Sequence, residues 1–489
     1  MQFKALTVAA IAFAALPVGA AAQNASSAVA AASKALGADG MTSITYSGTA
    51  RNGAFGQSKA IGQPLGSVND TRITAYMRAI SFAPAASPTA LVSRATGPTA
   101  PPAVPGFPPP MPGVYNQNVT GAQATGNWTQ ALNVWTTPWG FVKAAAANNA
   151  TMREEGGQRV ISFTPAGFKS PSGRTYTVTG YLNSRDLPTK IETRVENAVA
   201  GDMLVEFEYS NYRTLNGVQV PGRIVQKQAG LPVFEATITA ATANPPNLAE
   251  LLTPPAPPAG APAAAAAAPP AAPPVDKLGD GVFKIGGNYV SLAVDMGDHI
   301  LVVESGQSDA RGMAVMAAAK QAIPGKRIKY VVNSHPHFDH AGGLQAAVAE
   351  GATILTHRNN EPELERLLAN TRSLTGDSLS KKPGTRSNVV EGVGDRDVRR
   401  GTNGKVVELI YVPNQHSDGM LVVYLPAEKV LYTADMNVVN ANPAQLATVR
   451  AAARVTDKLD YNTYIMAHPP NPDRPLTKAD VVAALGTKQ

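Results

Sequence analysis

The stretch "VVNSHPHFDHAGG", Val331–Gly343, places three of the chain's seven histidines and one aspartate within six positions. A proline separates the first two histidines, and valines precede them, so the stretch predicts a loop at the end of a buried strand. His335 and His337 are one residue apart and can turn toward one ion, while Asp339 and His340 can face a second point nearby. Zinc needs about four ligands. The loop therefore predicts the beginning of two metal sites.

Three further candidate ligands follow predicted strands later in the chain. They are His416 in "NQHSDGM", Asp435 in "LYTADM" and His468 in "YIMAHPP". Such scattered residues converge only where strand ends line one edge of a sheet, which is a common way to build an α/β active site. Two other histidines, His299 and His357, stand alone and are predicted to be structural.

The order His-x-His-x-Asp-His, a later His-x-x-Gly, an aspartate after a strand and a late histidine resembles the metallo-β-lactamase superfamily of hydrolases. The resemblance covers the second domain and implies an αβ/βα sandwich. It also implies a ligand set for two metal ions: His335, His337 and His416 for one, Asp339, His340 and His468 for the other, and Asp435 as the bridge between them.

Two cations at such a site imply a metal-bridging hydroxide, because a bound metal lowers the pKa of water from about 15.7 toward about 7. Asp339 is predicted to orient that water and is the candidate catalytic residue. Ligation by histidine and carboxylate favours a pair of zinc ions, with iron or manganese also compatible. The predicted activity is metal-dependent hydrolysis.

The substrate follows only from the resemblance. An aspartate at position 435 is the pattern of the glyoxalase, lactonase and phosphodiesterase-like branches, which implies a small-molecule ester, lactone, thioester or phosphodiester. β-Lactam hydrolysis is one alternative. A ligand-binding protein with a vestigial metal domain is another. The sequence contains no cysteine nucleophile, no G-x-S-x-G elbow and no glycine-rich phosphate loop after a strand.

The N-terminal sequence "MQFKALTVAAIAFAALPVGAAAQ" predicts a signal peptide over residues 1–22. One lysine precedes an apolar run that is too short to span a bilayer, and small residues follow it. A periplasmic or secreted protein is expected, not a lipoprotein and without a membrane span. The formal charge of +7 comes without a long basic run, so nucleic acid is not expected as a partner.

Two proline-rich stretches divide the chain. A linker over residues 245–274 separates an N-terminal domain, residues 23–244, from a C-terminal domain, residues 275–489. A second stretch, residues 96–113, is predicted to be a long surface loop or a disordered insertion in the first domain.

The two domains have different patterns. Residues 159–244 alternate between apolar and polar, as in "MLVEFEYSNY", and an Asn216-Gly217 pair signals a hairpin, so the N-terminal domain is predicted to be mainly antiparallel sheet with a few helices. Its helix and strand order is similar to the curved-sheet LolA and LolB lipoprotein-carrier family, which implies a concave apolar surface. After the linker, strand and helix patterns alternate, which predicts a mixed α/β domain.

Three tryptophans precede the predicted sheet. Trp128, Trp135 and Trp139 are spaced by seven and four residues, which would place them on one side of a single helix. We expect that helix to pack against the sheet.

Overall fold

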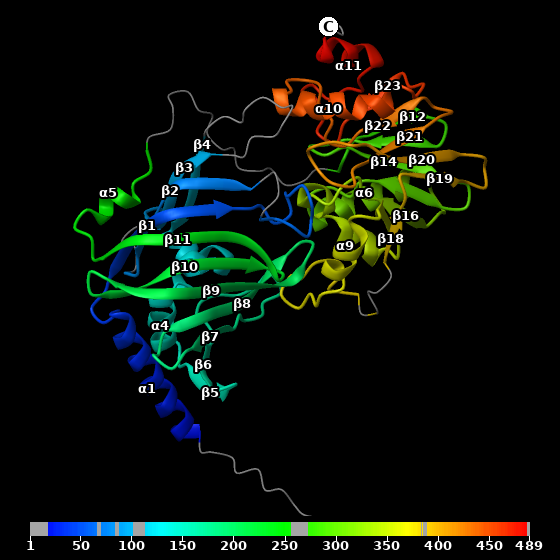
Figure 1. The fold of residues 1–489 in the computed structure, drawn as a ribbon. Helices are drawn as coiled ribbons and strands as arrows, with labels where there is room; N and C mark the ends of the chain where they lie inside the picture. Colours follow the sequence, from blue (N-terminus) through cyan, green and yellow to red (C-terminus); the bar gives the residue numbers. More distant parts are fainter. Residues whose placement is uncertain are drawn as a thin grey trace, which may run out of the picture.

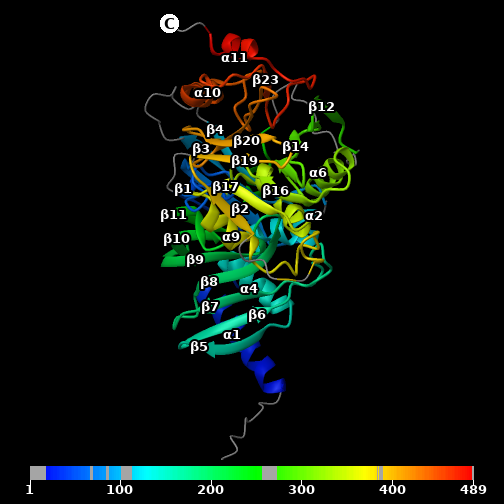
Figure 2. The same ribbon diagram turned by 90° about the vertical axis from the view of Figure 1, so that its right-hand side faces the viewer.

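The computed structural model describes residues 18–65, 70–83, 88–100, 113–255, 272–382, 384 and 389–486. Figures 1 and 2 show two domains in contact. The C-terminal helices lie at the end of the molecule that is farthest from the N-terminal helix. Most of the predicted signal peptide lies outside the described residues. Among the helices of the described residues, none is long and apolar enough to cross a membrane.

One sheet of eleven antiparallel strands forms the N-terminal domain, in the order β4-β3-β2-β1-β11-β10-β9-β8-β7-β6-β5. The strands are β1 Ser43–Asn52, β2 Thr71–Ser81, β3 Leu91–Ala100, β4 Gly113–Thr120, β5 Thr151–Glu155, β6 Gln158–Phe163, β7 Val178–Leu182, β8 Pro188–Asn197, β9 Gly201–Leu215, β10 Val218–Gln228 and β11 Leu231–Ala243. The prediction of a mainly antiparallel domain is confirmed.

The predicted alternation and hairpin are confirmed within this sheet. Val205, Phe207 and Tyr209 of β9 are all buried. Asn216 and Gly217 join β9 to β10 with φ of 48° and 80°, the left-handed pair that a tight hairpin turn needs. The sheet also includes β1 to β5, which the predicted range of residues 159–244 omitted. Small and polar residues are frequent in β1, β3 and β4, and the apolar alternation of these three strands is correspondingly weak.

Four helices complete this domain: α1 Val18–Leu36, α2 Gly121–Gly126, α3 Trp128–Trp135 and α4 Pro138–Ala147. Both α3 and α4 contact β8, while α3 also contacts β3 and β4 and α4 contacts β6, so the sheet curves around them. The single tryptophan helix is a wrong prediction. Thr137 caps a new helix and Pro138 occupies its first turn, so Trp139 belongs to α4. Burial of Trp128 and Trp139 in the core confirms the expected packing.

Both proline-rich stretches are partly structured. The predicted insertion begins and ends in paired strands, since β3 extends to Ala100 and β4 starts at Gly113; residues 101–112 lie outside the described residues. In the predicted linker, Leu248–Leu252 forms helix α5. Arg94 Nη1 of β3 donates to the Leu251 carbonyl at 3.2 Å, which anchors this helix to the sheet. Residues 256–271 lie outside the described residues.

Two sheets form the C-terminal domain, one with the order β12 to β18 and the other with the order β19 to β23. The first contains β12 Val275–Gly279, β13 Val282–Ile285, β14 Ser291–Asp295, β15 Ile300–Val303, β16 Ile328–Val332, β17 Thr353–His357 and β18 Val390–Val393. The second contains β19 Arg396–Arg400, β20 Val406–Tyr411, β21 Leu421–Leu425, β22 Val430–Tyr432 and β23 Thr463–Ile465.

Helices cover the outer face of each sheet. On the first sheet lie α6 Asp309–Ala322, α8 Leu344–Ala349 and α9 Glu361–Leu368, and on the second lie α10 Pro443–Thr456 and α11 Lys478–Leu485. The short helix α7, Phe338–Ala341, holds part of the histidine cluster. An apolar core that includes Leu292, Val303, Leu409 and Val423 fills the space between the sheets. The predicted αβ/βα sandwich is confirmed.

A buried polar contact joins the two domains. Asp202 of β9 accepts hydrogen bonds from the backbone N–H groups of Ser373 and Leu374, both at 2.8 Å. Arg372 donates to the carbonyls of Ala198 and Val199 and pairs with Asp377 at 2.6 Å. Because each of these groups needs its partner when buried, the contact fixes how the domains sit.

Candidate metal centre

The seven predicted ligands gather at one edge of the C-terminal sandwich. His335, His337, Asp339 and His340 follow β16 of the first sheet. The other three come from the second sheet: His416 from the loop after β20, Asp435 after β22 and His468 after β23. The site therefore lies where strand ends of both sheets meet.

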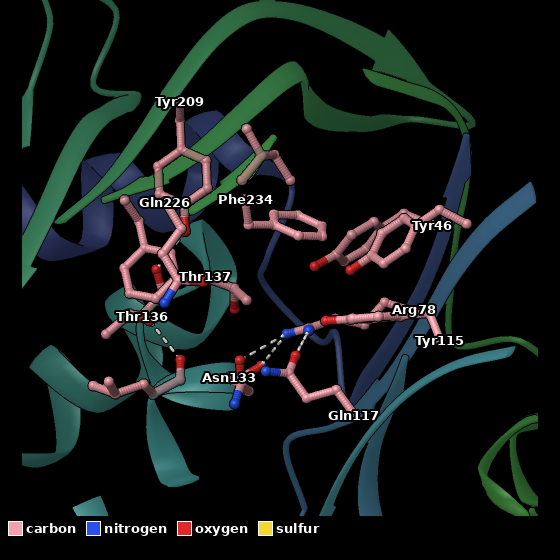
Figure 3. A pocket seen from close by; sticks show the side chains of 14 residues that line it. Tyr46, Arg78, Tyr115, Gln117, Asn133, Thr136, Thr137, Tyr209, Gln226 and Phe234 are labelled. Carbon is pink, nitrogen blue, oxygen red and sulfur yellow. Dashed lines mark hydrogen bonds between the residues drawn. The ribbon is translucent and has the colours of Figure 1, made fainter. Parts of the chain in front are cut away.

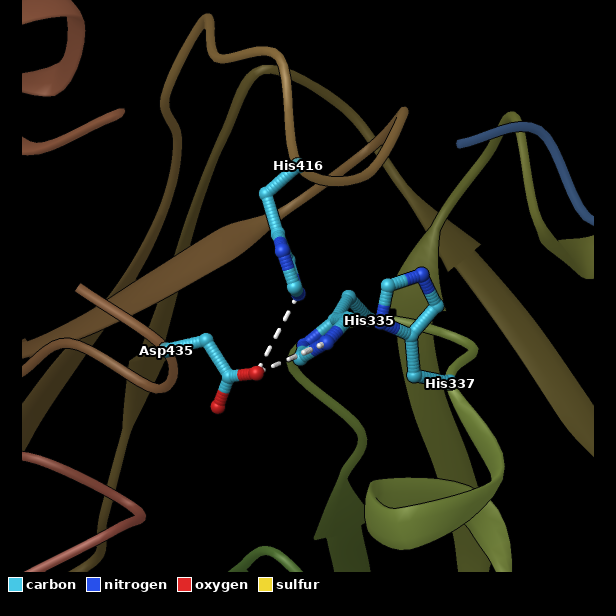
Figure 4. A group of neighbouring side chains, drawn as sticks. All are labelled: His335, His337, His416 and Asp435. Carbon is cyan, nitrogen blue, oxygen red and sulfur yellow. Dashed lines mark ion pairs between the residues drawn. The ribbon is translucent and has the colours of Figure 1, made fainter. Parts of the chain in front are cut away.

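Four of these side chains form a first group, shown in Figure 4. One ligand atom from each of His335, His337, His416 and Asp435 lies within 4.8 Å of the others. Asp435 Oδ2 is 3.1 Å from His416 Nε2 and 3.8 Å from His335 Nε2. The three imidazoles and one carboxylate face a common point.

A second group contains Asp339, His340, His468 and again Asp435. The other carboxylate oxygen of Asp435, Oδ1, is 2.9 Å from His340 Nε2 and 3.0 Å from His468 Nε2. Asp339 Oδ2 lies 3.3 and 3.5 Å from the same two nitrogens. Asp435 thus directs one oxygen to each group, which is the arrangement of a bridging carboxylate.

Four of the imidazole nitrogens that face these two points make no hydrogen bond within the described part of the chain, and three of the four lie within ion-pair distance of Asp435. They are His335 Nε2, His337 Nδ1, His340 Nε2 and His416 Nε2, all buried. Buried polar atoms are rarely left without a partner. Histidine nitrogens and carboxylate oxygens are ligands of zinc and related divalent ions, so the residues present fit a metal at each group.

The opposite nitrogens of two rings have partners. His335 Nδ1 lies 3.0 Å from Ser334 Oγ, and His337 Nε2 lies 3.1 Å from the carbonyl of Ser58. A carbonyl accepts only, so His337 carries its proton on Nε2 and presents a free lone pair on Nδ1. A metal-binding histidine is commonly held by such a second contact.

Electrostatics differ between the two groups. Burial and the neighbouring histidine His416 lower the pKa of His337 to about 4, and burial with neighbouring histidines lowers the pKa of His335 well below its usual value. Both rings are neutral at pH 7, as metal ligation requires. Burial alone would lower the pKa of His340, but Asp435 and Glu304 outweigh it and raise that pKa. The carboxylates around the second group therefore favour a positive charge at this point.

Glu304 is a functional candidate that the sequence did not reveal. Its side chain is 2% exposed, and its Oε2 lies 3.3 Å from His340 Nδ1. Its Oε1 accepts from the Ser334 N–H at 2.7 Å. Glu304 therefore orients the His340 ring through Nδ1, the nitrogen that faces away from the metal site. A lone carboxylate at the end of the apolar run "HILVV" is the only sequence signal for it.

The N-terminal domain also reaches the site. Residues 53–65, which follow β1, run against the histidine loop, and we call them the capping segment. Gln57 Nε2 donates to Asp339 Oδ1 at 2.6 Å, and the Phe338 N–H donates to the Gly56 carbonyl at 2.8 Å. Phe55 packs edge-on against the Phe338 ring, with centroids 5.0 Å apart.

The capping segment also contacts the loop that carries His416. Lys59 Nζ donates to Gln415 Oε1 at 3.1 Å, and the Asp418 N–H donates to the Lys59 carbonyl at 2.6 Å. One segment of the first domain thus holds both metal-binding loops of the second. No sequence motif marks it, since "GAFGQSK" has the composition of an ordinary loop.

The site opens on one side. His416, His468 and Asp339 are half-buried, with side chains 31%, 34% and 22% exposed, whereas His335 is fully buried. Tyr289 lies at this opening, with its ring edge-on to His468 at 4.8 Å between centroids. Solvent therefore reaches the site at these three side chains.

The remaining two histidines lie outside both groups. His299 contacts Asp298, with Nδ1 and Oδ1 2.7 Å apart. His357 stacks on Tyr411, with centroids 4.8 Å apart.

Comparison with protein families gives a match over residues 285–468 to the model described as the metallo-beta-lactamase superfamily. A curated relative, the 2,4-dinitroanisole O-demethylase subunit alpha of Nocardioides sp. (strain JS1661), is 28% identical over 156 residues. That alignment covers 32% of this chain and 42% of the relative, so the chain spans less than half of the relative's length.

Solved structures similar to this chain include a metallo-beta-lactamase from Pontibacter korlensis, with 15% identity and a TM-score of 0.33 over 44% of this chain and 97% of that one. Another is a metallo-beta-lactamase from Hirschia baltica, with 20% identity and a TM-score of 0.32 over 44% of this chain and 96% of that one.

Proposed function

Because residues 285–468 belong to the metallo-beta-lactamase superfamily, we propose that the chain is a dinuclear metal-dependent hydrolase of small molecules. The observation that carries the proposal is Asp435, which directs one oxygen to each of two ligand groups whose imidazole nitrogens are buried and face its carboxylate. A ligand set without a metal function would leave these groups buried at a cost in stability.

The ligand roles follow the two groups. His335, His337 and His416 would hold one cation, Asp339, His340 and His468 the other, and Asp435 both. Zinc suits this donor set best, and iron or manganese is also compatible. When bound, the ions would supply Lewis-acid polarisation of the substrate and a lowered pKa for the attacking water.

The chain's own residues would position the reactants. Asp339 is partly exposed, and Gln57 fixes its carboxylate by donating to Oδ1, so the carboxylate could orient the attacking water and accept its proton. Glu304 would keep His340 in one orientation. Tyr289 would limit the approach of the substrate to the side of His468.

We propose an ester, lactone, thioester or phosphodiester as the substrate class, supported by the aspartate at the bridging position. The relative from Nocardioides is named an O-demethylase subunit, which makes an activated aryl methyl ether a second candidate. We also propose export from the cytoplasm, supported by the sequence of residues 1–22.

A substrate panel tests the proposal. The full chain, stripped with a chelator and reloaded with zinc, would be assayed on one ester, lactone, thioester, phosphodiester, aryl methyl ether and β-lactam. We expect hydrolysis of at least one of the first four, lost on stripping, restored on reloading and absent from His416→Ala. Zinc-dependent turnover of the β-lactam alone would instead establish a β-lactamase. No zinc-dependent turnover on any substrate would contradict the proposal.

A further inference from the structure

A cationic side chain of the N-terminal domain lies beside the metal-binding loops of the other domain. Lys59, in the capping segment, donates from Nζ to Gln415 Oε1 at 3.1 Å, across 356 positions of sequence. Gln415 directly precedes the metal ligand His416. The ammonium of Lys59 therefore lies next to a loop that carries one of the ligands.

The backbone around Lys59 is fixed against two of these loops. The Ser58 carbonyl lies 3.1 Å from His337 Nε2, and the Lys59 carbonyl accepts from the Asp418 N–H at 2.6 Å. These two contacts are made by consecutive residues of the capping segment. Lys59 is thus held at the border of the metal centre, between the loops that carry His337 and His416.

Lys59 has no carboxylate partner in the described part of the chain. The ion pairs between described residues include other lysines, such as Lys227 and Lys320, but not Lys59. Its ammonium has three N–H donors, and the side chain of Gln415 is a neutral acceptor for one of them. The positive charge at this border of the site is therefore not neutralised by a described residue.

The same border is open to solvent. Lys59 is partly exposed, and the side chain of His416 is 31% exposed. Because neighbouring Cα atoms in a chain are about 3.8 Å apart, a ligand that reaches His416 passes close to Gln415 and the ammonium that it holds. A cation in this place attracts anionic ligands and favours them over neutral ones.

Arg78, another positively charged side chain of the N-terminal domain, is not open to such a ligand. It lies beside a cavity of about 30 Å³, room for roughly one or two water molecules. Figure 3 shows its guanidinium directed at Asn133 and Gln117, whose oxygens accept its hydrogen bonds. Arg78 is therefore a structural residue of its domain.

We propose that Lys59 selects substrates that carry an anionic group, a carboxylate or a phosphate, beside the bond that is hydrolysed. This rests on the proposed function, because the substrate must also reach the metal centre. The N-terminal domain then supplies selectivity, and the C-terminal domain supplies the reaction.

Calorimetric titration of the zinc-loaded full chain with pairs of thiols tests the proposal without a hydrolysis assay. The pairs are mercaptoacetate, 3-mercaptopropionate and 4-mercaptobutyrate, each with its neutral amide, so the members of a pair differ by one charge. A thiolate sulfur is a zinc ligand and brings the other end of the molecule to the border of the site.

We expect the acid of at least one pair to bind roughly tenfold more tightly than its amide. Lys59→Met should lose this preference, and Lys59→Arg should keep it. Lys320→Met is the matched control, because it removes a lysine that pairs with Glu350 on the surface and should leave the preference unchanged.

A second variant keeps the test informative if Lys59→Met does not fold. Gln415→Glu places a carboxylate 3.1 Å from the Lys59 ammonium and should also remove the preference. Equal binding of acid and amide by the wild type, or a preference that survives in either folded variant, would overturn this proposal and leave the proposed function standing. If no thiol binds in a zinc-dependent way, the metal centre fails, and both proposals fail with it.

Discussion

Each metal-binding imidazole has one nitrogen that faces the site. In the three rings on the histidine loop, the other nitrogen contacts a neighbouring residue. The contacts come from Ser334, Ser58 and Glu304 for His335, His337 and His340. Such partners set the tautomer and ring orientation before a metal binds. Preorganisation of the ligands is thus encoded by residues outside the sequence motif.

Glu304→Gln tests this at one residue. The amide would place a donor against His340 Nδ1, which must itself donate when Nε2 holds a metal. We expect the affinity for zinc to fall by about 10- to 100-fold, measured by competition with a chromophoric chelator. Asp298→Asn is the control, because Asp298 contacts His299 outside the site and its loss should leave zinc affinity unchanged. An unchanged zinc affinity in Glu304→Gln would show that Glu304 does not support metal binding.

The seven side chains that meet could be predicted from the sequence, whereas the residues that support them could not. A histidine cluster is visible because histidine is rare and because the chemistry restricts its spacing. Gln57 acts across 282 positions of sequence and Ser58 acts through its backbone carbonyl, so neither has a residue pattern that could signal the role.

At the scale of elements, the capping segment links the first domain to the chemistry of the second. It approaches closely because Gly56 has no side chain: a Cβ there would lie 2.3 Å from the Phe338 ring, and its φ is +80°. The segment holds Asp339 and the His416 loop from one side. The N-terminal domain is therefore part of the metal centre's surroundings.

Gly56→Ala should displace the capping segment from the histidine loop. We expect kcat/KM on whichever substrate the panel identifies to fall roughly 10- to 100-fold, because displacements of about 1 Å near reacting groups have effects of this size. Gly157→Ala carries the same backbone strain, with φ of +76°, but no atom lies within 4 Å of its new Cβ. Equal activities in the two variants would show that the capping segment has no part in catalysis.

Strands and turns could be predicted from the sequence where neighbouring residues form a recognisable pattern. Alternation in β9 and the Asn216-Gly217 turn are such signals, and both are confirmed. The break between α3 and α4 was missed because heptad-like tryptophan spacing outweighed the Thr137-Pro138 pair that starts a new helix. The strands β1 and β3 were missed because small and polar residues such as Ser, Thr and Gly are frequent in them, which weakens the apolar alternation.

At the scale of the whole molecule, the position of the capping segment depends on the contact between the domains. Burial alone would raise the pKa of Asp377, but Arg372 outweighs it and holds that pKa below its usual range. A depressed folded pKa means that the pair stabilises the fold above the unfolded pKa, near 3.9, and that this stability is lost as pH falls.

Asp377→Asn should therefore destabilise the chain at pH 7 by about 3 kcal/mol, because a buried guanidinium loses its charged partner. The difference from the wild type should shrink as the pH falls below about 4. Chemical unfolding at a series of pH values measures both. Glu363→Gln, which removes a partly exposed pair with Arg366, should cost no more than about 1 kcal/mol. A pH-independent difference for Asp377→Asn would contradict the assignment of the pair.

The arrangement of the two domains was beyond the reach of sequence reasoning, since both of their contacts join segments more than 150 positions apart. The proline-rich residues between the domains predicted a linker but not how the domains are placed, which Asp202 and the capping segment determine by direct contact.

The most direct measurement is the metal content of the full chain by native mass spectrometry after loading with zinc. We expect a mass increase that corresponds to about two zinc ions in the wild type, one fewer in His337→Ala, and the wild-type increase in His299→Ala. Binding of one ion or none by the wild type would contradict the central claim that Asp435 bridges two metals.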